Sequence, residues 1–272
     1  MSEPSAWIPV GELGTAFESE DAYRLRPVEP LLDRTLALHF ESGAIVNLAF
    51  APGSRITWSS DREDTGIQNA TAPYQATEIR TGIVLVDFLA PREPATAVSL
   101  ILDLREGICT ALIGRLPTEH EAHISLPERI EQNRELTAVT AVVLSGAIDR
   151  PFAQTTRRHA LTRELIGKRI EYSYSPKERY EHVYLNENFY TWHCLTGAEQ
   201  GLADTDRCSY RKLADRLYLF AWREKIVPTL GVVILDLEQM KTTGKIFGYR
   251  DFAFKGVTNF GIGARARILS SP

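Results

Sequence analysis

The segment Ala97-Val-Ser-Leu-Ile-Leu-Asp-Leu104 decides the fold, because its last four residues recur as Ile234-Leu-Asp-Leu237, 133 positions further along the chain. Two more anchors recur in the same order at an offset of 134: Thr57-Trp58 as Thr191-Trp192, and Pro94 as Pro228. Self-similarity at nearly one offset predicts an internal duplication. A repeat of about 134 residues is too long for a solenoid unit and fits a whole small domain.

Both copies contain short apolar runs that are rich in β-branched and aromatic side chains, which is typical of strands. Such runs cover 47–51, 56–59, 83–88, 97–104, 184–186, 190–194, 217–222 and 232–237, with turn residues such as Pro52-Gly53 between them. Short strands at this spacing predict an antiparallel meander that closes into a barrel, with room for one small ligand. We therefore expect an all-β fold of two tandem antiparallel β-barrels with short helical connectors. The first domain would cover 1–150 and the second 151–272.

The composition is that of an ordinary globular protein, with 44% hydrophobic and 24% charged residues among 272. A net charge of −4 gives no support for a nucleic-acid partner. No apolar run approaches the roughly 20 residues that cross a bilayer, and the N-terminus lacks a basic region followed by an apolar run. Three cysteines do not make a disulfide framework. We expect a cytoplasmic protein without a membrane partner, and we leave a homodimer open.

Strand alternation places several polar side chains of the second copy on common faces. Tyr172 and Tyr174 point the same way, and in the segment 218–224 three aromatic residues share a face with Glu224. An aromatic row that ends in a carboxylate resembles a pocket wall, and burial there would raise the glutamate pKa toward the range useful for proton transfer. Two ordinary alternatives stay open: a Tyr-x-Tyr pair in a plain strand, and a surface ion pair between Glu224 and Lys225.

The order of these landmarks resembles two known families. Tyr172-Ser-Tyr174, Tyr180-Glu181, Trp222-Arg-Glu224 and Pro228-Thr229 resemble the bacterial phenolic acid decarboxylases, which are cofactor-free enzymes built on a lipocalin-like barrel. Longer segments resemble the C-terminal domain of the MoaF family over about 166–249. They are Tyr190-Thr-Trp-His-Cys-Leu195, Gly201-Leu-Ala-Asp-Thr-Asp-Arg-Cys208, Phe220-Ala-Trp-Arg-Glu-Lys-Ile-Val-Pro-Thr229 and Thr243-Gly-Lys-Ile-Phe-Gly-Tyr249.

The decarboxylase resemblance implies Tyr172 and Tyr174 as hydrogen-bond donors to a substrate oxygen and Glu224 as proton donor or acceptor. The substrate-binding residues that we expect around them are Tyr180, Tyr190, Trp192, His193, Phe220 and Trp222. The decarboxylase arginine has no counterpart, because the matching position falls near Leu202. Arg207 and Arg223 are possible substitutes, although alternation turns Arg223 away from Glu224.

Two functions of different class are compatible with these residues. The first is a lyase-, isomerase- or cyclase-type enzyme without metal or organic cofactor, acting on a small aromatic or conjugated molecule inside the second barrel. The alternative is a lipocalin-like protein that binds or carries a small hydrophobic molecule. In the first copy, Leu38, Phe40 and Ala90 occupy the places of Tyr172, Tyr174 and Glu224, so we expect its site to be degenerate.

Overall fold

The computed structural model describes residues 6–18, 20–61 and 69–272, and this part of the chain is mostly β-structure. The chain divides into two compact units, and each contains one β-barrel. We call them the first unit (Leu25–Arg115 and Ala141–His159) and the second unit (Met1–Arg24, Leu116–Thr140 and Ala160–Pro272). The prediction of an all-β protein with two tandem antiparallel barrels is confirmed.

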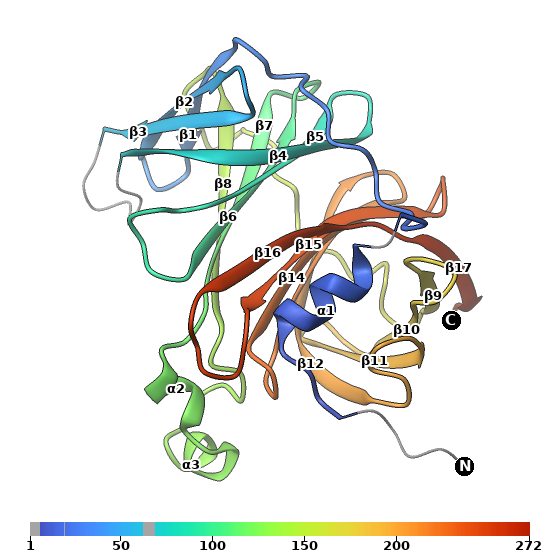
Figure 1. Ribbon diagram of the computed structural model, residues 1–272. Coiled ribbons are helices and arrows are strands. Elements are labelled where there is room, and N and C mark those ends of the chain that lie inside the picture. Colours follow the sequence, from blue (N-terminus) through green and yellow to red (C-terminus); the bar gives the residue numbers. More distant parts are fainter. Residues whose placement is uncertain (1–5, 19, 62–68) are drawn as a thin grey trace. The chain divides into compact units, whose positions relative to one another are not determined.

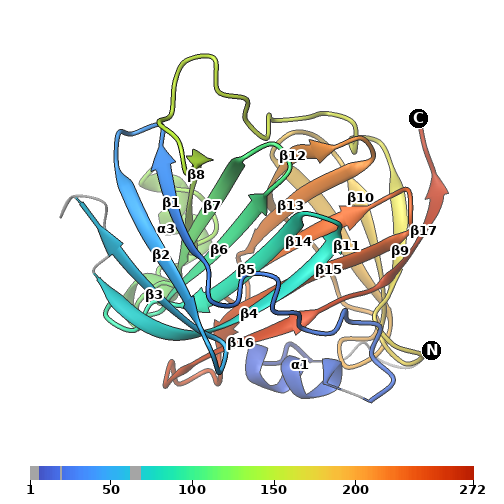
Figure 2. The same cartoon turned by 90° about the horizontal axis from the view of Figure 1, so that it is seen from above.

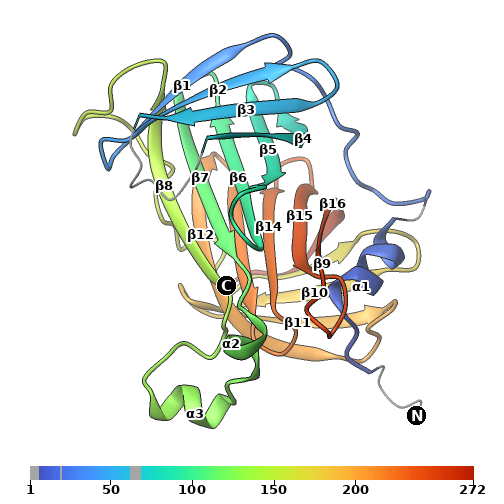
Figure 3. The same ribbon diagram turned by 60° about the vertical axis from the view of Figure 1, so that its left-hand side comes forward.

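The first unit is built around a closed barrel of eight antiparallel strands (Figure 1 and Figure 3). Each strand pairs with the next, and β8 returns to β1, where Leu38 stands opposite Ile148. Aromatic side chains fill the interior, and the Trp58 and Phe88 rings lie 4.8 Å apart between centroids. The strands are β1 (Thr35–Phe40), β2 (Ile45–Ala51), β3 (Arg55–Ser60), β4 (Ala70–Arg80), β5 (Ile83–Leu89), β6 (Thr96–Asp103), β7 (Ile108–Arg115) and β8 (Thr140–Ile148).

The second unit repeats this arrangement with a different closure. Strands β9 to β15 pair antiparallel in chain order, and β17 closes the ring by pairing with β9 and, through Arg265 and Lys241, with β15. Strand β16 adds to the free length of β15. The strands are β9 (Arg169–Ser173), β10 (Arg179–Tyr184), β11 (Phe189–Thr196), β12 (Ala203–Ala214), β13 (Leu217–Glu224), β14 (Thr229–Asp236), β15 (Lys241–Tyr249), β16 (Val257–Ile262) and β17 (Arg265–Ser270).

The internal duplication extends to single hydrogen bonds between strands. In the first barrel, the hydroxyl groups of Thr57 and Thr71 lie 2.8 Å apart across β3 and β4. In the second barrel, Thr191 and Thr205 form the same contact at 2.7 Å across β11 and β12. Both pairs are related by the offset of 134 found in the sequence, so the two copies share strand register as well as strand order.

A second repeated feature explains why the Ile-Leu-Asp-Leu motif recurs. Asp103 ends β6 and Asp236 ends β14, and each is almost fully buried. One carboxylate oxygen of each accepts the backbone N–H groups two and three positions further along, at 2.8 to 3.2 Å. An aspartate that holds the following turn in this way stabilises the hairpin leading to the next strand.

Helix α1 (Val10–Phe17) belongs to the second unit, although it lies more than 140 residues before the first strand of that barrel. Val10, Leu13 and Phe17 recur at helical spacing, are buried and join the apolar core of the second barrel. The helix packs against β15 and β16, as the view from above shows (Figure 2). The N-terminal segment therefore completes the wall of a barrel formed by the C-terminal part of the chain.

The expected short helical connectors are present as α2 (Glu119–His123) and α3 (Leu126–Glu131) (Figure 3). Thr118 and Glu121 form a reciprocal capping box at the start of α2, while the Ser125 hydroxyl caps α3. Within the described residues, the helices are too short and polar to include a candidate membrane span.

Candidate active site in the second barrel

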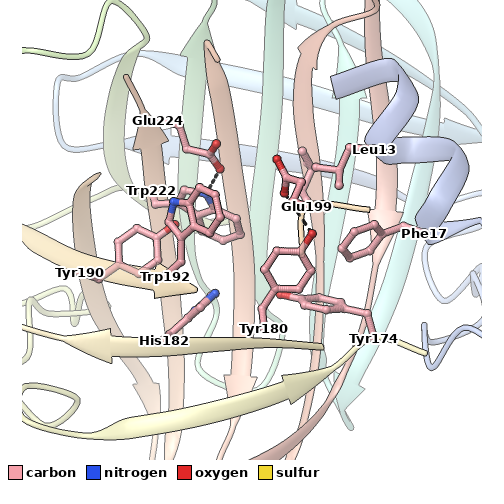
Figure 4. A pocket seen from close by; sticks show the side chains of 11 residues that line it. Leu13, Phe17, Tyr174, Tyr180, His182, Tyr190, Trp192, Glu199, Trp222 and Glu224 are labelled. Atoms are coloured by element: carbon pink, nitrogen blue, oxygen red, sulfur yellow. Dashed lines mark hydrogen bonds between the residues drawn. The ribbon is translucent and has the colours of Figure 1, made fainter. Parts of the chain in front are cut away.

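An aromatic and acidic cavity lies inside the second barrel (Figure 4). It has a volume of about 30 Å³, which is room for about two water molecules. Side chains from the strands, from α1 and from the turn after β11 line it. They are Leu13, Phe17, Tyr174, Tyr180, His182, Tyr190, Trp192, Glu199, Trp222, Glu224 and Ile246.

Glu224 reaches this cavity because it is the last residue of β13 and shares the inward face with Phe220 and Trp222. The Trp222 indole N–H donates to Glu224 Oε1 at 2.8 Å, and the Thr137 hydroxyl donates to the Glu224 backbone carbonyl, also at 2.8 Å. Desolvation among packed side chains raises the pKa of Glu224 well above its usual value, and the charges of Asp206 and Glu199 raise it further. This setting favours the protonated form of the Glu224 carboxyl group.

A second carboxyl group enters the cavity from the turn between β11 and β12. Glu199 is buried and accepts a hydrogen bond from the Tyr180 hydroxyl at 3.0 Å. Burial is the main cause that raises the pKa of Glu199. The turn is fixed by Glu178, which accepts the Ala198 N–H, and by Gly197, whose φ of +129° and contact with Glu178 leave no room for a side chain.

A third carboxyl group stands behind the aromatic wall. Asp206 Oδ2 accepts the Trp192 indole N–H at 3.0 Å, and Oδ1 accepts the backbone N–H of Lys225 at 3.1 Å. The Lys225 ammonium group lies 3.5 Å from Asp206 and pairs more closely with Asp204. Burial raises the pKa of Asp206 to about 6, against the lowering effect of Lys225. Two indoles thus each bind one carboxyl group, Trp192 to Asp206 and Trp222 to Glu224.

His182 is the basic side chain that lines the cavity. It is 5% exposed, and no described residue hydrogen-bonds its Nδ1 atom. Its ring packs within 4.8 Å of Tyr172 and 5.1 Å of Tyr190 between centroids. Burial lowers the pKa of His182 to about 3, so the imidazole is neutral at physiological pH. A neutral ring has one nitrogen that accepts a hydrogen bond and one that donates.

The three predicted catalytic residues lie inside the second barrel, but only Tyr174 and Glu224 line the cavity. Tyr174 lines it, and its ring packs 4.8 Å from Phe17 and 5.8 Å from Tyr180 between centroids. Burial, with the charge of Glu224 as second cause, raises the pKa of Tyr174. Tyr172 lies deeper in the core, where its hydroxyl is 2.6 Å from that of Tyr184, and it does not line the cavity. Its hydroxyl is therefore engaged with a protein partner.

The structure places most of the predicted binding residues where alternation put them. Tyr180, Tyr190, Trp192 and Trp222 line the cavity. Phe220 does not line it but stacks behind Trp222, with 5.1 Å between ring centroids.

One predicted position needs correction, and neither possible substitute for the decarboxylase arginine lies at the cavity. His193 is exposed, because its neighbours Trp192 and Cys194 point inward and strand alternation sends the residue between them outward. Arg207 and Arg223 do not replace the missing arginine, since both bind Glu135 away from the cavity.

Five lining residues of this cavity were not predicted from the sequence, namely Leu13, Phe17, His182, Glu199 and Ile246, and four of them have identifiable reasons. His182 shares a face of β10 with Tyr180 and Tyr184, so the same period of two would have found it. Glu199 lies in a turn, where no periodicity exists to signal its direction. Leu13 and Phe17 show helical spacing, but the sequence does not indicate which barrel the helix covers.

The matching positions of the first barrel carry no comparable chemistry. Leu38, Phe40 and Ala90 are buried. Leu38 and Phe40 belong to the apolar core of that barrel. These observations define the class: a protein of two duplicated β-barrels, of which the second encloses an aromatic and acidic cavity completed by an N-terminal helix.

Comparison with known proteins identifies the family of this chain. Residues 5–118 match the MoaF N-terminal domain, and residues 159–272 match the MoaF C-terminal domain. A curated relative, Protein MoaF of Klebsiella aerogenes, is 44% identical over 210 residues, which cover 77% of this chain and 79% of that protein. The chain belongs to the MoaF family. Among solved structures, a putative beta-lactamase from Burkholderia vietnamiensis aligns with 16% identity and a TM-score of 0.34, over 40% of this chain and all of that one.

Proposed function

We propose that the second barrel is an enzyme site that moves protons on a small aromatic or conjugated molecule, with Glu224 as the proton carrier. The observation that supports it is the setting of Glu224: its carboxyl group is desolvated, is hydrogen-bonded through one oxygen to Trp222, and borders a cavity. General acids and bases work best when their pKa lies near the working pH. Burial raises a glutamate pKa from its ordinary value toward this range.

The reaction class follows from the groups available. Protonated Glu224 would donate its proton to a carbon of a conjugated system, and the resulting carboxylate would take a proton from an adjacent position or from the product. Tyr174 and Tyr180 hydroxyls at the cavity would stabilise charge that develops on a ligand oxygen. Such proton transfers fit a lyase-, isomerase- or cyclase-type reaction that uses only side chains of this chain.

A binding protein without catalysis is the second candidate, and the cavity wall favours it. Tyr190, Trp192 and Trp222 supply broad apolar surface that holds an aromatic ligand whether or not it reacts. The two functions differ in the fate of the ligand, which is consumed or exchanged in one case and recovered intact in the other.

The test is deuterium incorporation from D2O, because it detects proton transfer at carbon even when the product has not been identified. A panel of phenolic acids, catecholamines and polyketides is incubated with the protein and analysed by mass spectrometry. We expect one class to gain deuterium or change mass, and Glu224→Gln to slow this by about 10² to 10⁴-fold. Glutamine keeps the size of the side chain and can still accept from Trp222.

Glu238→Gln is the matched control, since Glu238 is exposed in the turn after β14 and the charge change is the same. A ligand that binds and is recovered unlabelled would support the binding function instead. Exchange that persists within about threefold in Glu224→Gln would remove Glu224 from the mechanism.

A further inference from the structure

The cavity lining is acidic. Among the eleven described side chains that line it, two carry carboxyl groups and none is lysine or arginine. Glu199 and Glu224 come from separate elements, the turn after β11 and the end of β13. Asp206 adds a third carboxyl group just behind Trp192. Clustered carboxyl groups disfavour one another's ionisation, and a cation bound between them would stabilise their ionised form, whereas a ligand carboxylate would add one more negative charge without a lysine or arginine in the lining to compensate for it.

Aromatic faces surround these carboxyl groups. The rings pack in pairs along the cavity wall: Tyr180 and Trp192 lie 6.3 Å apart, and Tyr190 and Trp222 lie 6.0 Å apart between centroids. The face of an aromatic ring attracts cations, and cages of tyrosine and tryptophan are a recurrent way to bind ammonium groups. The combination of rings and acids therefore favours a positively charged ligand.

His182 provides an independent sign of a ligand. Its Nδ1 atom is buried without a partner among the described residues, although buried polar atoms are nearly always hydrogen-bonded. Figure 4 shows the His182 side chain directed toward the space between Trp222 and Tyr180. A neutral imidazole there can accept a hydrogen bond from an N–H donor.

We propose that the molecule taken up by the second barrel is an organic ammonium cation, with its charged nitrogen between Glu199 and Glu224 and an N–H group donated to His182. This inference rests on the proposed function, for which it names the ligand class. It separates the chain from carboxylate-binding decarboxylases, which use an arginine that has no counterpart in the cavity wall.

The position of the organic group follows from the size of the cavity. About 30 Å³ accommodates an ammonium head, so the remainder of the ligand has to take space now filled by a side chain. Phe17 is that side chain, because its ring already packs against Tyr174 and Tyr180 at 4.8 and 5.9 Å and comes from a short helix rather than from the barrel itself. A bound aromatic amine would replace the Phe17 ring on the same two tyrosines.

Calorimetric titration of the full chain with benzylamine, benzyl alcohol and benzoate tests this at pH 7. The three probes share a ring and differ in charge. We expect benzylamine to bind at least about tenfold more tightly than benzyl alcohol, and benzoate to bind least. Phe17→Ala should tighten benzylamine binding by removing the competing ring. Glu199→Gln and Glu224→Gln should each weaken it by about tenfold, whereas the exposed control Glu238→Gln should not.

The comparison of three ligands on the unmodified protein needs no variant, so a misfolded variant cannot obscure it. The inference would be overturned if benzoate or benzyl alcohol bound as tightly as benzylamine or more tightly. It would also be overturned if benzylamine bound neither the wild type nor Phe17→Ala. The two proposals fail separately. If an amine binds but is recovered without deuterium at carbon, the ligand class stands and the proton transfer is refuted. If only anionic molecules exchange at carbon, the proton transfer stands and the ligand class is refuted.

Discussion

The raised pKa of Glu224 predicts how the stability of the second unit depends on pH. The folded protein keeps this proton at pH values where the unfolded chain has lost it, starting from an ordinary value of 4.5. The stability that this proton preserves is complete below about pH 4.5 and is lost as pH rises toward the folded-state pKa. Each pH unit within that window costs about 1.4 kcal/mol per group.

Glu224→Gln removes this contribution because glutamine does not titrate. Between pH 5 and pH 7, we expect the wild type to lose up to about 3 kcal/mol relative to the variant. Asp206 acts in the same direction only up to its pKa of about 6. His182, whose pKa is lowered to about 3, acts in the opposite direction and loses stability as pH falls below its ordinary value of 6.5. Both groups remain in the variant, so the difference between the two proteins isolates Glu224 and its coupling to Asp206 and Glu199.

Urea unfolding followed by tryptophan emission measures this difference. The chain has four tryptophans, and in a Trp58→Phe background the remaining three, Trp7, Trp192 and Trp222, all belong to the second unit. The unfolding signal then reports that unit alone. If Glu224→Gln kept the pH slope of the parent while Glu238→Gln behaved identically, Glu224 would be ionised in the folded protein and the reasoning about its proton would be wrong.

Two further changes test the surroundings of Glu224, and a third tests the exposed face of β11. Trp222→Phe keeps an aromatic ring but removes the donor to Oε1, and we expect a loss of about 1–3 kcal/mol in the same urea experiment, together with a further rise in the Glu224 pKa. Gly231→Ala would place a methyl group within 2.1 Å of the Trp222 ring, so we expect it to destabilise by about 1–3 kcal/mol and to shift tryptophan emission. His193→Ala, on the exposed face of β11, should change stability by less than about 0.5 kcal/mol and leave ligand binding unchanged, as titration with benzylamine would show.

Much of the fold was predictable because two local rules agree with the tertiary structure. The repeated Ile-Leu-Asp-Leu motif marks equivalent strand ends, where Asp103 and Asp236 each hold a turn. The period of two correctly predicted that Trp222 and Glu224 point into the barrel, because β13 pairs with a strand on each side and its side chains therefore alternate between the interior and the exterior.

The remainder of the site depends on contacts between residues far apart in the sequence. Glu199 is directed by a turn that Glu178 fixes through the Ala198 N–H, and neither residue follows a period. Tyr172 shares a face with Tyr174, yet the hydroxyl of Tyr184 binds it in the core. Alternation determines the side of a strand that a residue occupies, but it does not determine how deep in the barrel the residue lies.

The place of helix α1 has a consequence for the order in which this protein can fold during synthesis. The helix is synthesised before all strands of both barrels, whereas the strands that it packs against, β15 and β16, follow β1 to β14 in the chain. Its apolar face, with Leu13 and Phe17, therefore has no native partner until β15 and β16 have been translated. A fragment that begins at residue 159 would contain every strand of the second barrel and still lack part of the cavity wall, because Leu13 and Phe17 come from a helix that precedes the first barrel.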